Sequence, residues 1–446
     1  MSTGVVWFRK DLRLTDNPAW VAATRRHERV VALFVVDPHL WNAVSSRRVA
    51  LLAGHLRALD SSIRDLGGRL RIEHGDPVNV VEDVVSSTGA SDVTVNADVS
   101  PYAKVRDEAA ATRFDLDVHH GSLIHPPGSI LTREGSRYRV FTPFSRTWFE
   151  TPFPEWGVPG SANIRSDPGS DLPEVGQPQM EPGESAAIER LDAFQPDRYP
   201  EERNRPDLDS TSRLSIDLKY GVLSPLTVAS HVGTTTDDAR SFVRQLAWRD
   251  FHAHLLDADP GLVDHAMKPS YDAIAWRDDQ QGFDAWKEGM TGYPLVDAGM
   301  RQLLAEGWMH NRVRMITASF LVKDLLIDWR RGERWFRRQL LDGDVPQNVG
   351  NWQWVAGSGA DASPYFRVFN PVAQSEKFDP RGDYIRRWIP ELAGVLEAFI
   401  HEPWKAGPLE LEAWGAESYP PPIVDHAEAR QRTLTAYQTA VGNPRS

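Results

Sequence analysis

The chain has 446 residues, of which 41% are hydrophobic and 25% charged, and its formal net charge is −12 at pH 7. This length predicts two or three domains, and the acidic balance argues against a protein that coats nucleic acid nonspecifically. Because the chain has no cysteine, disulfides, thiolate nucleophiles and cysteine-ligated zinc or iron–sulfur sites are excluded.

The N-terminal sequence MSTGVVWFRKDLRL passes into charged residues after a short apolar run. It therefore lacks the apolar region of a signal peptide. No apolar run elsewhere approaches the roughly 20 residues that span a bilayer. These features predict a cytoplasmic protein. We expect it to be a monomer without a metal site.

Short β-branched runs alternate with helical patterns in the N-terminal part of the chain. The runs GVVWF, RVVALFVVD, RLRIEHG, DVTVNAD and LDVHHG predict strands, with helices from about Pro18 and over Ser45–Leu66. Apolar strands that alternate with helices indicate a parallel sheet covered on both faces. The first strand–helix turn, FRKDLRLTDNPAW, lacks the G-x-G-x-x-G that binds a dinucleotide. Residues 1–124 are thus predicted to form an α/β domain with a Rossmann-like sheet but without that fingerprint.

Proline, glycine, serine and acidic residues dominate the chain from His125 to about Glu184. This composition predicts a surface connector over residues 125–185. Helical patterns dominate beyond it, for example over Asn311–Arg331, where apolar residues recur at helical spacing. Residues 186–446 are therefore predicted to form an all-helical domain.

Sixteen tryptophans are many for this length, and most lie in the helical half. Core packing is the ordinary role of any single one. The stretch DGDVPQNVGNWQW, residues 342–354, nevertheless groups two indoles with carboxylates and amides. Residues 297–339 also carry nine Lys or Arg against five Asp or Glu. That excess fits either a solvated helix surface or a basic patch.

Three further stretches combine polar side chains with predicted helices. DSTSRLS, residues 209–215, is a hydroxyl-rich helix start that fits either a bound phosphate or an ordinary N-cap. RQLAWRDFHAHLL, residues 244–256, fits a functional helix or a packed helix with a charged face. WMHNRVRMITASF, residues 308–320, includes Arg314, which can pair with the carboxylates of Asp342 and Asp344. His310 in this stretch is interpreted as a structural histidine rather than a base.

Together these motifs resemble the DNA photolyase and cryptochrome family. TSRLS, WRDF, GYPLVDAGMRQL, GWMHNRVRMITASFLVKDLLIDW, DGD, NWQW, PYFRVFNP and YIRRWIPEL occur in the order found in its helical flavin domain, and VVWFRKDLRLTDNPA resembles its first strand and turn. The resemblance extends from Val5 to about Trp404. The motif sequences are most similar to those of bacterial class I cyclobutane pyrimidine dimer photolyases. The resemblance implies an N-terminal antenna domain and a C-terminal domain that binds FAD and UV-damaged DNA.

The activity implied by the resemblance is that of a deoxyribodipyrimidine photo-lyase. Excited reduced FAD passes an electron to a pyrimidine dimer that has been flipped out of the duplex, the cyclobutane ring splits, and the electron returns. A flavin cannot reach a base that is stacked in a duplex, which is why flipping is required.

The resemblance also implies a role for individual residues. The cofactor-binding positions are Tyr199, Thr211, Ser212, Arg213, Leu214, Ser215, Arg249, Asn311, Arg314, Asp342, Gly343, Asp344 and Asn348, the last facing flavin N5. The tryptophans that relay electrons to the flavin are Trp276, Trp329 and Trp352. The indoles that sandwich the lesion are Trp248 and Trp354, and the other DNA or lesion contacts are Arg203, Gln245, Arg249, Asn311, Arg312 and Gln374. The catalytic positions are Gln245, Asn311, Met315 and Asn348.

Several residues depart from the pattern of the dimer photolyases. Gln245 stands where these enzymes have a glutamate that bonds the lesion, and Phe242 stands where they usually have tryptophan. Glutamine at that point is typical of (6-4) photolyases and animal-type cryptochromes, whereas Met315 stands where (6-4) enzymes carry histidine. Val345-Pro346 and Asn351 also differ from the residues usually found at these positions around the flavin in the family. A blue-light photoreceptor and (6-4) repair therefore remain alternatives to dimer repair.

An antenna chromophore is expected in the N-terminal domain. The stretch ADVSPYAKVRD lacks the Asn-Glu pair associated with folate antennas. Its sequence is more similar to that of proteins that bind a deazaflavin or a flavin as antenna. We therefore expect the antenna chromophore to be one of these two.

Overall fold

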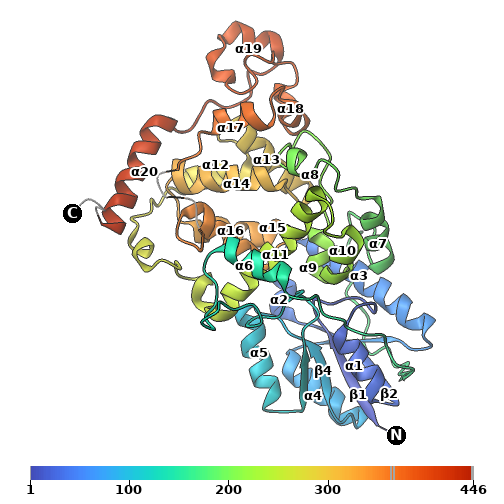
Figure 1. Cartoon of the computed structure of the whole chain (residues 1–446). Coiled ribbons are helices and arrows are strands. Elements are labelled where there is room, and N and C mark those ends of the chain that lie inside the picture. Colours follow the sequence, from blue (N-terminus) through green and yellow to red (C-terminus); the bar gives the residue numbers. More distant parts are fainter. Residues whose placement is uncertain (1, 362–363, 365–366, 443–446) are drawn as a thin grey trace. The chain divides into compact units, whose positions relative to one another are not determined.

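The computed structural model describes residues 2–361, 364 and 367–442 (Figure 1). The chain forms two compact units. Unit 1 comprises Met1–Asp197, Ser212–Pro260 and Leu341–Pro346, and unit 2 comprises Arg198–Thr211, Gly261–Leu340 and Gln347–Ser446. The units therefore alternate along the chain, and each is built from segments distant in sequence.

Unit 1 contains a parallel sheet with the strand order β3-β2-β1-β4-β5. Its strands are β1 (Thr3–Phe8), β2 (Arg29–Val36), β3 (Leu70–His74), β4 (Val93–Asn96) and β5 (Leu116–His119). All neighbouring strands run parallel, and Thr3 pairs with Arg29 at the start of the β1–β2 register. All five strands predicted from the sequence are thus confirmed.

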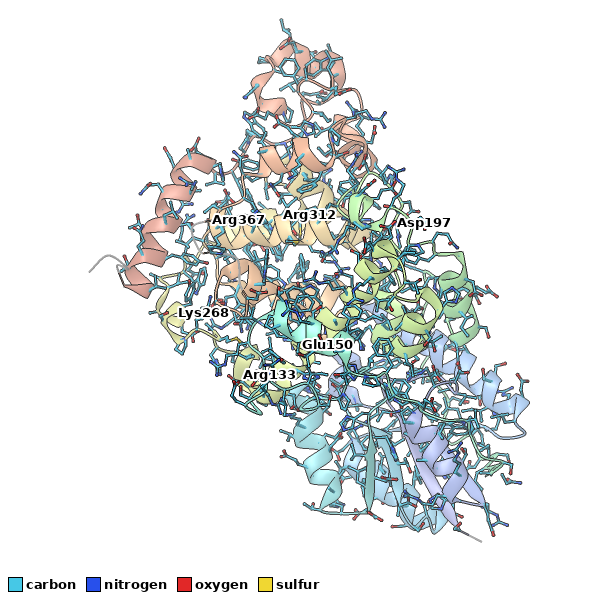
Figure 2. All side chains as sticks on the ribbon, in the orientation of Figure 1. Arg133, Glu150, Asp197, Lys268, Arg312 and Arg367 are labelled. Atoms are coloured by element: carbon cyan, nitrogen blue, oxygen red, sulfur yellow. The ribbon has the colours of Figure 1, made fainter. Side chains whose placement is uncertain are left out.

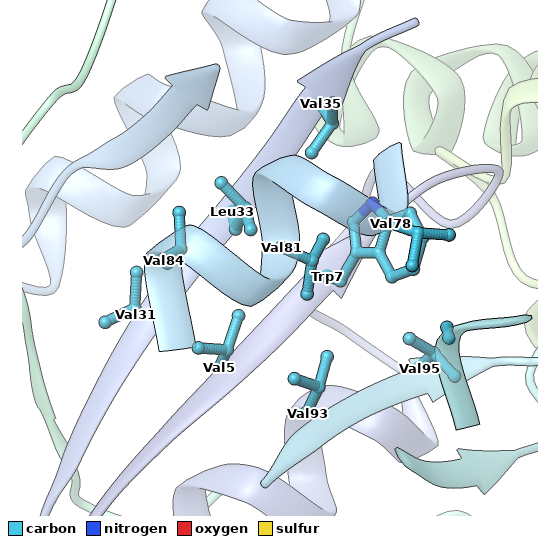
Figure 3. Close-up of a cluster of buried hydrophobic side chains, with 11 residues drawn as sticks. Val5, Trp7, Val31, Leu33, Val35, Val78, Val81, Val84, Val93 and Val95 are labelled. Atoms are coloured by element: carbon cyan, nitrogen blue, oxygen red, sulfur yellow. The ribbon is translucent and has the colours of Figure 1, made fainter. Parts of the chain in front are cut away.

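Helices cover both faces of this sheet. On one face α4 (Pro77–Thr88) buries Val78, Val81 and Val84 against strand residues that include Trp7 (Figure 3). Because successive strand residues point to opposite faces, Phe8 points the other way. There it meets Trp20 of α1 (Pro18–Arg26), with ring centroids 5.8 Å apart. Each fully buried side chain of this kind contributes about 1.5–3 kcal/mol.

The remaining helices of unit 1 include the predicted helix that follows β2. This helix, α3, spans Ser46–Asp65 and confirms the prediction of Ser45–Leu66. The others are α2 (Pro38–Asn42), α5 (Pro101–Ala111), α6 (Phe141–Glu150), α7 (Glu184–Ala193), α9 (Ser215–Tyr220), α10 (Pro225–Val232) and α11 (Asp237–Ala258).

Helix α6 corrects the expectation that residues 125–185 are only a surface connector. Its aromatic residues Phe141, Phe144 and Trp148 recur at helical spacing and are buried. Trp148 Nε1 donates a 2.8 Å hydrogen bond to the buried carboxylate of Asp250 on α11. A two-residue strand, β6 (Asn163–Ile164), also pairs with β2. Proline and glycine on both sides of α6 concealed its short apolar pattern.

Unit 2 is built from helices, with no strand among its described residues. In Figure 1 its helices α12 (Gln280–Glu288), α13 (Pro294–Glu306) and α14 (Asn311–Ser319) lie side by side. The others are α8 (Tyr199–Glu202), α15 (Trp329–Gln339), α17 (Pro371–Phe378), α18 (Asp383–Trp388), α19 (Pro408–Trp414), α20 (His426–Val441) and most of α16 (Val345–Ala356). Across the described part of the chain, no helix combines the length and apolar character needed to cross a membrane.

The segment Asn311–Arg331 is not one continuous helix. A π-helical turn, Phe320–Asp324, follows α14, and Leu326 then takes a left-handed conformation with φ of 53°. Asp328 accepts a hydrogen bond from the backbone N–H of Arg330 and starts α15 at Trp329. Apolar residues are buried both before and after this break, so their spacing in the sequence continues through it. The sequence pattern therefore could not show where the first helix ends.

Candidate functional site

An ion-pair cluster lies at the carboxyl ends of the central strands in unit 1. Lys10 follows β1 and Asp98 follows β4, the two strands between which the strand order reverses. Lys10 Nζ lies 3.4 Å from Asp98 and 2.7 Å from Asp344. In open α/β sheets this reversal point is where ligands bind.

The loop Asp342–Asp344 is held to unit 1 by three hydrogen-bonded anchors. Ser215 Oγ donates to Asp342 at 2.6 Å, an Arg48 guanidinium N–H donates to the carbonyl of Gly343 at 3.2 Å, and Lys10 binds Asp344. The DGD sequence thus forms a fixed acidic turn. It connects the start of α9 with the end of β1.

The predicted hydroxyl-rich helix start is present at α9. Ser215 is its first residue, Leu214 is its N-cap without a side-chain cap bond, and Arg213 has a φ of 53°. Ser212 Oγ accepts a 3.4 Å hydrogen bond from the Leu214 N–H. The hydroxyl of Ser215 bonds Asp342 rather than capping its own helix.

Charge balance in this part of unit 1 depends on Lys10 and Arg249. Burial alone would raise the pKa of the Asp344 carboxyl, but attraction to Lys10 and then to Arg249 lowers it below its usual value. Arg249 donates hydrogen bonds to the backbone carbonyls of Ser122 and Leu218, which fixes its guanidinium. Asp344 is therefore a carboxylate at neutral pH.

Helix α11 presents the other predicted residues of unit 1. Gln245 Nε2 donates a 3.0 Å hydrogen bond to the carbonyl of Ser241, one turn earlier. The Trp248 ring stacks on Phe141 of α6, with ring centroids 3.6 Å apart and an interplanar angle of 12°. One face of the Trp248 indole is therefore already covered within the protein.

Asn348 is fixed by a buried carboxylate in unit 2. Its Nδ2 donates to both the backbone carbonyl and the Oε1 of Glu333, each at 2.9 Å. Glu333 lies on α15 and is 3% exposed. Because the amide nitrogen is bound to Glu333, the amide oxygen points away from α15.

The three predicted relay tryptophans differ in exposure. Trp352 and Trp329 are 2% and 1% exposed, whereas Trp276 is half-buried. A Cβ on Gly332 of α15 would lie 2.2 Å from Trp352, so glycine allows the indole to rest directly on the helix that begins at Trp329. Trp276 packs edge-on against Tyr437 with centroids 6.2 Å apart.

Gln353 fixes the helix turn between the two indoles of NWQW. Its Oε1 accepts from the Met267 N–H at 2.9 Å, and its Nε2 donates to the carbonyls of Leu262 and His265 at 2.8 and 2.9 Å. Because residues two apart in a helix point about 200° from each other, Trp352 and Trp354 face different surroundings. Trp352 is buried and Trp354 is half-buried.

Helix α14 brings four predicted residues together. Asn311 Nδ2 lies 3.9 Å from the sulfur of Met315, one turn later on the same face. Arg314 Nε donates to the carbonyl of Met309 at 2.7 Å. Arg312 donates to Asn204 at 2.7 Å and lies over the Phe378 ring at 4.4 Å.

Arginines cluster around Arg312 in unit 2. Burial, and then repulsion from Arg203 and Arg367, lowers the pKa of Arg312 to about 10. Arg312 and Arg367 are labelled in Figure 2. Arg203 also lies 5.3 Å from the ring centroid of Tyr199, and Gln374 lies one turn before Phe378 on α17. The predicted DNA-contact residues Arg203 and Arg312 therefore lie close enough for their charges to repel.

His310 caps a helix, which fits its interpretation as a structural histidine. Its Nδ1 accepts a 3.2 Å hydrogen bond from the Arg312 N–H and caps α14. Burial, and then repulsion from Arg314 and Arg312, lowers its pKa to about 4. The ring is therefore neutral at pH 7.

The predicted residues are divided between the two units. Unit 1 holds Ser212, Arg213, Leu214, Ser215, Gln245, Trp248, Arg249, Asp342, Gly343 and Asp344, and unit 2 holds Tyr199, Arg203, Thr211, Trp276, Asn311, Arg312, Arg314, Met315, Trp329, Asn348, Trp352, Trp354 and Gln374. The pairing of Arg314 with Asp342 and Asp344 joins the two sets and stays a prediction. Within the PYFRVFNP motif, Tyr365 and Phe366 lie outside the described residues.

Four structurally important residues were missed by sequence reasoning. Lys10 could have been recognised, because it is a charged residue shortly after a buried strand. Glu333 and Gln353 lie in helices whose pattern of polar residues does not distinguish them from other polar residues. Phe141 lies in the segment predicted to be a connector. Their partners are distant in sequence, which no local pattern reports.

Comparison with known proteins identifies the family. Residues 4–159 match the family model described as DNA photolyase, and residues 242–439 match the one described as the FAD binding domain of DNA photolyase. The chain is 41% identical to a deoxyribodipyrimidine photo-lyase of Agrobacterium fabrum, over 97% of both chains. It is 40% identical to the one of Escherichia coli, over 99% of both chains.

Solved structures agree with this result. A bacterial class III photolyase from Agrobacterium tumefaciens has a TM-score of 0.91 at 40% identity, covering 99% of this chain and 98% of that one. An archaeal photolyase from Sulfolobus tokodaii, solved with two FAD molecules, scores 0.87 at 33% identity over 98% and 100%. A Synechocystis cryptochrome scores 0.90 at 28% identity over 98% and 99%. From its sequence, its fold and these relatives, the chain belongs to the DNA photolyase family.

Proposed function

We propose that this protein repairs cyclobutane pyrimidine dimers in DNA in a reaction driven by light. The observation that carries the proposal is its similarity, over nearly the whole chain, to relatives named deoxyribodipyrimidine photo-lyase. FAD, when bound and reduced, supplies the excited electron that splits the cyclobutane ring and takes that electron back. The protein's own residues bind the cofactor, feed it electrons and hold the lesion.

The residues present fit a flavin dinucleotide. On unit 1, Ser215, Arg249 and the Asp342–Asp344 loop offer hydroxyl, cationic and carboxylate groups, and Lys10 and Arg48 hold the loop in place. On unit 2, Asn348 offers a neutral amide whose nitrogen is occupied by Glu333, which leaves its oxygen to accept a hydrogen bond. Asn348 would present this oxygen as a neutral acceptor to an N–H group of the bound flavin, without adding charge.

The tryptophans support an electron relay. Trp276 is half-buried, whereas Trp329 and Trp352 lie in the core of unit 2. We infer that electrons enter at Trp276 and pass through Trp329 to Trp352. Gly332 keeps the last indole in contact with the helix that carries Trp329.

Two surfaces support binding of damaged DNA. The arginine cluster of unit 2, with Arg312 at its centre, suits backbone phosphates. Trp248 of unit 1 has one face stacked on Phe141, so its other face is the one proposed to meet the flipped lesion. Trp354 of unit 2 is proposed as the second indole.

Gln245 bears on which lesion is repaired. An amide can hydrogen-bond a thymine edge but supplies no charge. The alternative of (6-4) repair rests on this residue, and Met315 opposes it. The alternative of a photoreceptor is favoured by the likeness to the Synechocystis cryptochrome.

We also propose that a second chromophore, of deazaflavin or flavin type, binds to unit 1. The proposal is supported by the sequence of residues 97–107 and by the two FAD molecules in the structure of the Sulfolobus tokodaii relative. Helix α5 carries Tyr102 and Arg106, which lie against His39 and Trp7 at 5.3 and 4.9 Å. Acid extraction followed by mass spectrometry of the purified protein tests it, and a folate would contradict it.

The repair proposal is tested by illuminating the protein, with its flavin reduced, in the presence of UV-damaged oligothymidine. Recovery of thymine absorbance at a rate that depends on light supports dimer repair. A protein that binds flavin but gives no recovery would favour the photoreceptor. Recovery only on an oligonucleotide with a (6-4) lesion would favour that alternative.

A further inference from the structure

A basic pocket in unit 1 has no role in the site described above. It lies between α6 and the first half of α11 and has a volume of about 350 Å³. Its polar lining includes Thr142, Ser145, Arg146, Arg240, Ser241 and Arg244. Asp237 is the carboxylate among its lining residues, so three arginines against one aspartate leave a formal charge of +2.

Two of the arginines are oriented by aromatic rings of α6. The Arg240 guanidinium lies 4.2 Å from the ring centroid of Phe149, and that of Arg244 lies 5.2 Å from Phe141. Stacking of this kind holds the guanidinium while leaving its N–H groups exposed. A ligand that binds them therefore loses less side-chain entropy than it would on freely rotating arginines.

Asp237 balances only one of the three arginine charges that line the pocket. Within the described ranges, Arg146, Arg240 and Arg244 have no carboxylate at ion-pair distance. Arg240 and Arg244 are one turn apart on α11, a spacing at which like charges repel each other and destabilise a helix. An anion bound between them would remove this repulsion.

The pocket adjoins the indole proposed to stack on the lesion. Arg240, Arg244 and Trp248 follow one another at intervals of four residues and thus share one side of α11. Phe141 connects them, because it contacts Arg244 and stacks on Trp248 at 3.6 Å. A strand whose base meets Trp248 would pass its neighbouring phosphate close to Arg244.

We propose that this pocket binds a backbone phosphate of the damaged strand, next to the flipped lesion. Guanidinium forks and hydroxyl donors are the groups that recognise a phosphodiester. In a protein with a net charge of −12, DNA binding needs such local basic sites. The inference rests on the proposed function in DNA repair and adds an anchor on unit 1 to the arginine cluster of unit 2.

The test is the salt dependence of binding to UV-damaged oligothymidine in the dark. For the double variant Arg240→Gln/Arg244→Gln we expect binding weaker by roughly three- to tenfold at low salt. The slope of log K against log salt should fall by about 0.7, the value for one phosphate of a single strand. Arg57→Gln on α3, which removes an exposed arginine elsewhere on unit 1, should change neither quantity.

Two results would overturn the proposal. The first is wild-type affinity and slope in the double variant. The second is weaker binding that Arg240→Lys/Arg244→Lys does not restore in slope, since lysine keeps the charge. Melting temperatures of all variants identify a loss of folding. Absence of light-driven repair by the wild-type protein, with the slope difference intact, would instead contradict the proposed function alone.

Discussion

The side-chain nitrogen of Asn348 donates to both the backbone carbonyl and the carboxylate of Glu333, each at 2.9 Å. Arg337 Nε lies 3.3 Å from the same carboxylate. Burial raises the pKa of Glu333, although Arg337 and Asn348 oppose this rise. The pair therefore fixes which atom of Asn348 is presented to a ligand, and it does so from within unit 2.

Replacing Glu333 tests that relationship. Glu333→Ala removes the carboxylate that accepts from Asn348, so we expect the free energy of unfolding to fall by about 1–3 kcal/mol. Glu333→Gln retains an acceptor oxygen and should cost less. Urea unfolding measures both, and equal stability of the alanine variant and the wild type would show that the bond does not hold Asn348.

Gly332→Ala tests the packing of Trp352. The added Cβ would lie 2.2 Å from the indole and 2.5 Å from Leu321, so the indole or α15 must shift. We expect destabilisation by about 1–3 kcal/mol. In Gly176→Ala, the matched control, no atom lies within 4 Å of the new Cβ, and no loss is expected. Thermal unfolding that does not distinguish the two variants would contradict this packing.

The electron relay predicts slow photoreduction of oxidised flavin in Trp276→Phe, Trp329→Phe and Trp352→Phe. Phenylalanine keeps the packing but is much harder to oxidise than tryptophan. Trp335→Phe, on the same helix as Trp329, removes an indole outside the proposed relay and should leave the rate unchanged. Flavin absorbance under blue light gives the rates, and wild-type rates in all three variants would eliminate the relay.

The buried carboxyl of Asp250 should make the free energy of unfolding depend on pH. Burial raises its pKa to about 6 despite hydrogen bonds from Trp148 and His125. The folded state therefore holds a proton that the unfolded state has lost, and this contribution to stability is present below about pH 4 and is lost as pH rises through about 6. The unfolding free energy of the wild type relative to Asp250→Asn should fall by up to about 1.4 kcal/mol per pH unit in this window. A difference independent of pH would contradict the burial of a titrating carboxyl.

Gln245→Glu tests the departure from the dimer photolyases. A glutamate cannot donate to the carbonyl of Ser241 as Gln245 Nε2 does at 3.0 Å, and it adds a negative charge. We expect faster dimer repair per photon absorbed. Gln195→Glu, an exposed site, controls for net charge. Slower repair in Gln245→Glu would indicate a site adapted to a different lesion or binding mode.

The strands of unit 1 could be predicted because their apolar runs are continuous and their separating helices are long. Helix α6 could not, since its three aromatic residues are enclosed by proline- and glycine-rich sequence. The break at Leu326 was also invisible, because Leu325 and Leu326 are buried whichever helix they belong to. The predicted boundaries at residues 124 and 185 follow composition, whereas the compact units follow contacts between distant segments.

Motifs located most of the candidate site, but not its supports. DGD and NWQW could be recognised as candidate motifs, but not the contacts that hold them: Lys10 fixes DGD and Gln353 fixes NWQW through partners far along the chain, and Glu333 fixes Asn348 between the two motifs. Lys10 bonds Asp344 across 334 positions, and Gln353 bonds Met267 across 86. Such contacts follow from the fold, not from spacing.

Dimer repair is tested most directly by one measurement. The protein with reduced flavin is mixed with oligothymidine that carries cyclobutane dimers, and absorbance at the thymine band is followed in blue light and in the dark. We expect recovery in light, none in the dark, and no net consumption of reductant because the electron returns. Bound, reduced flavin without recovery in light would contradict dimer repair.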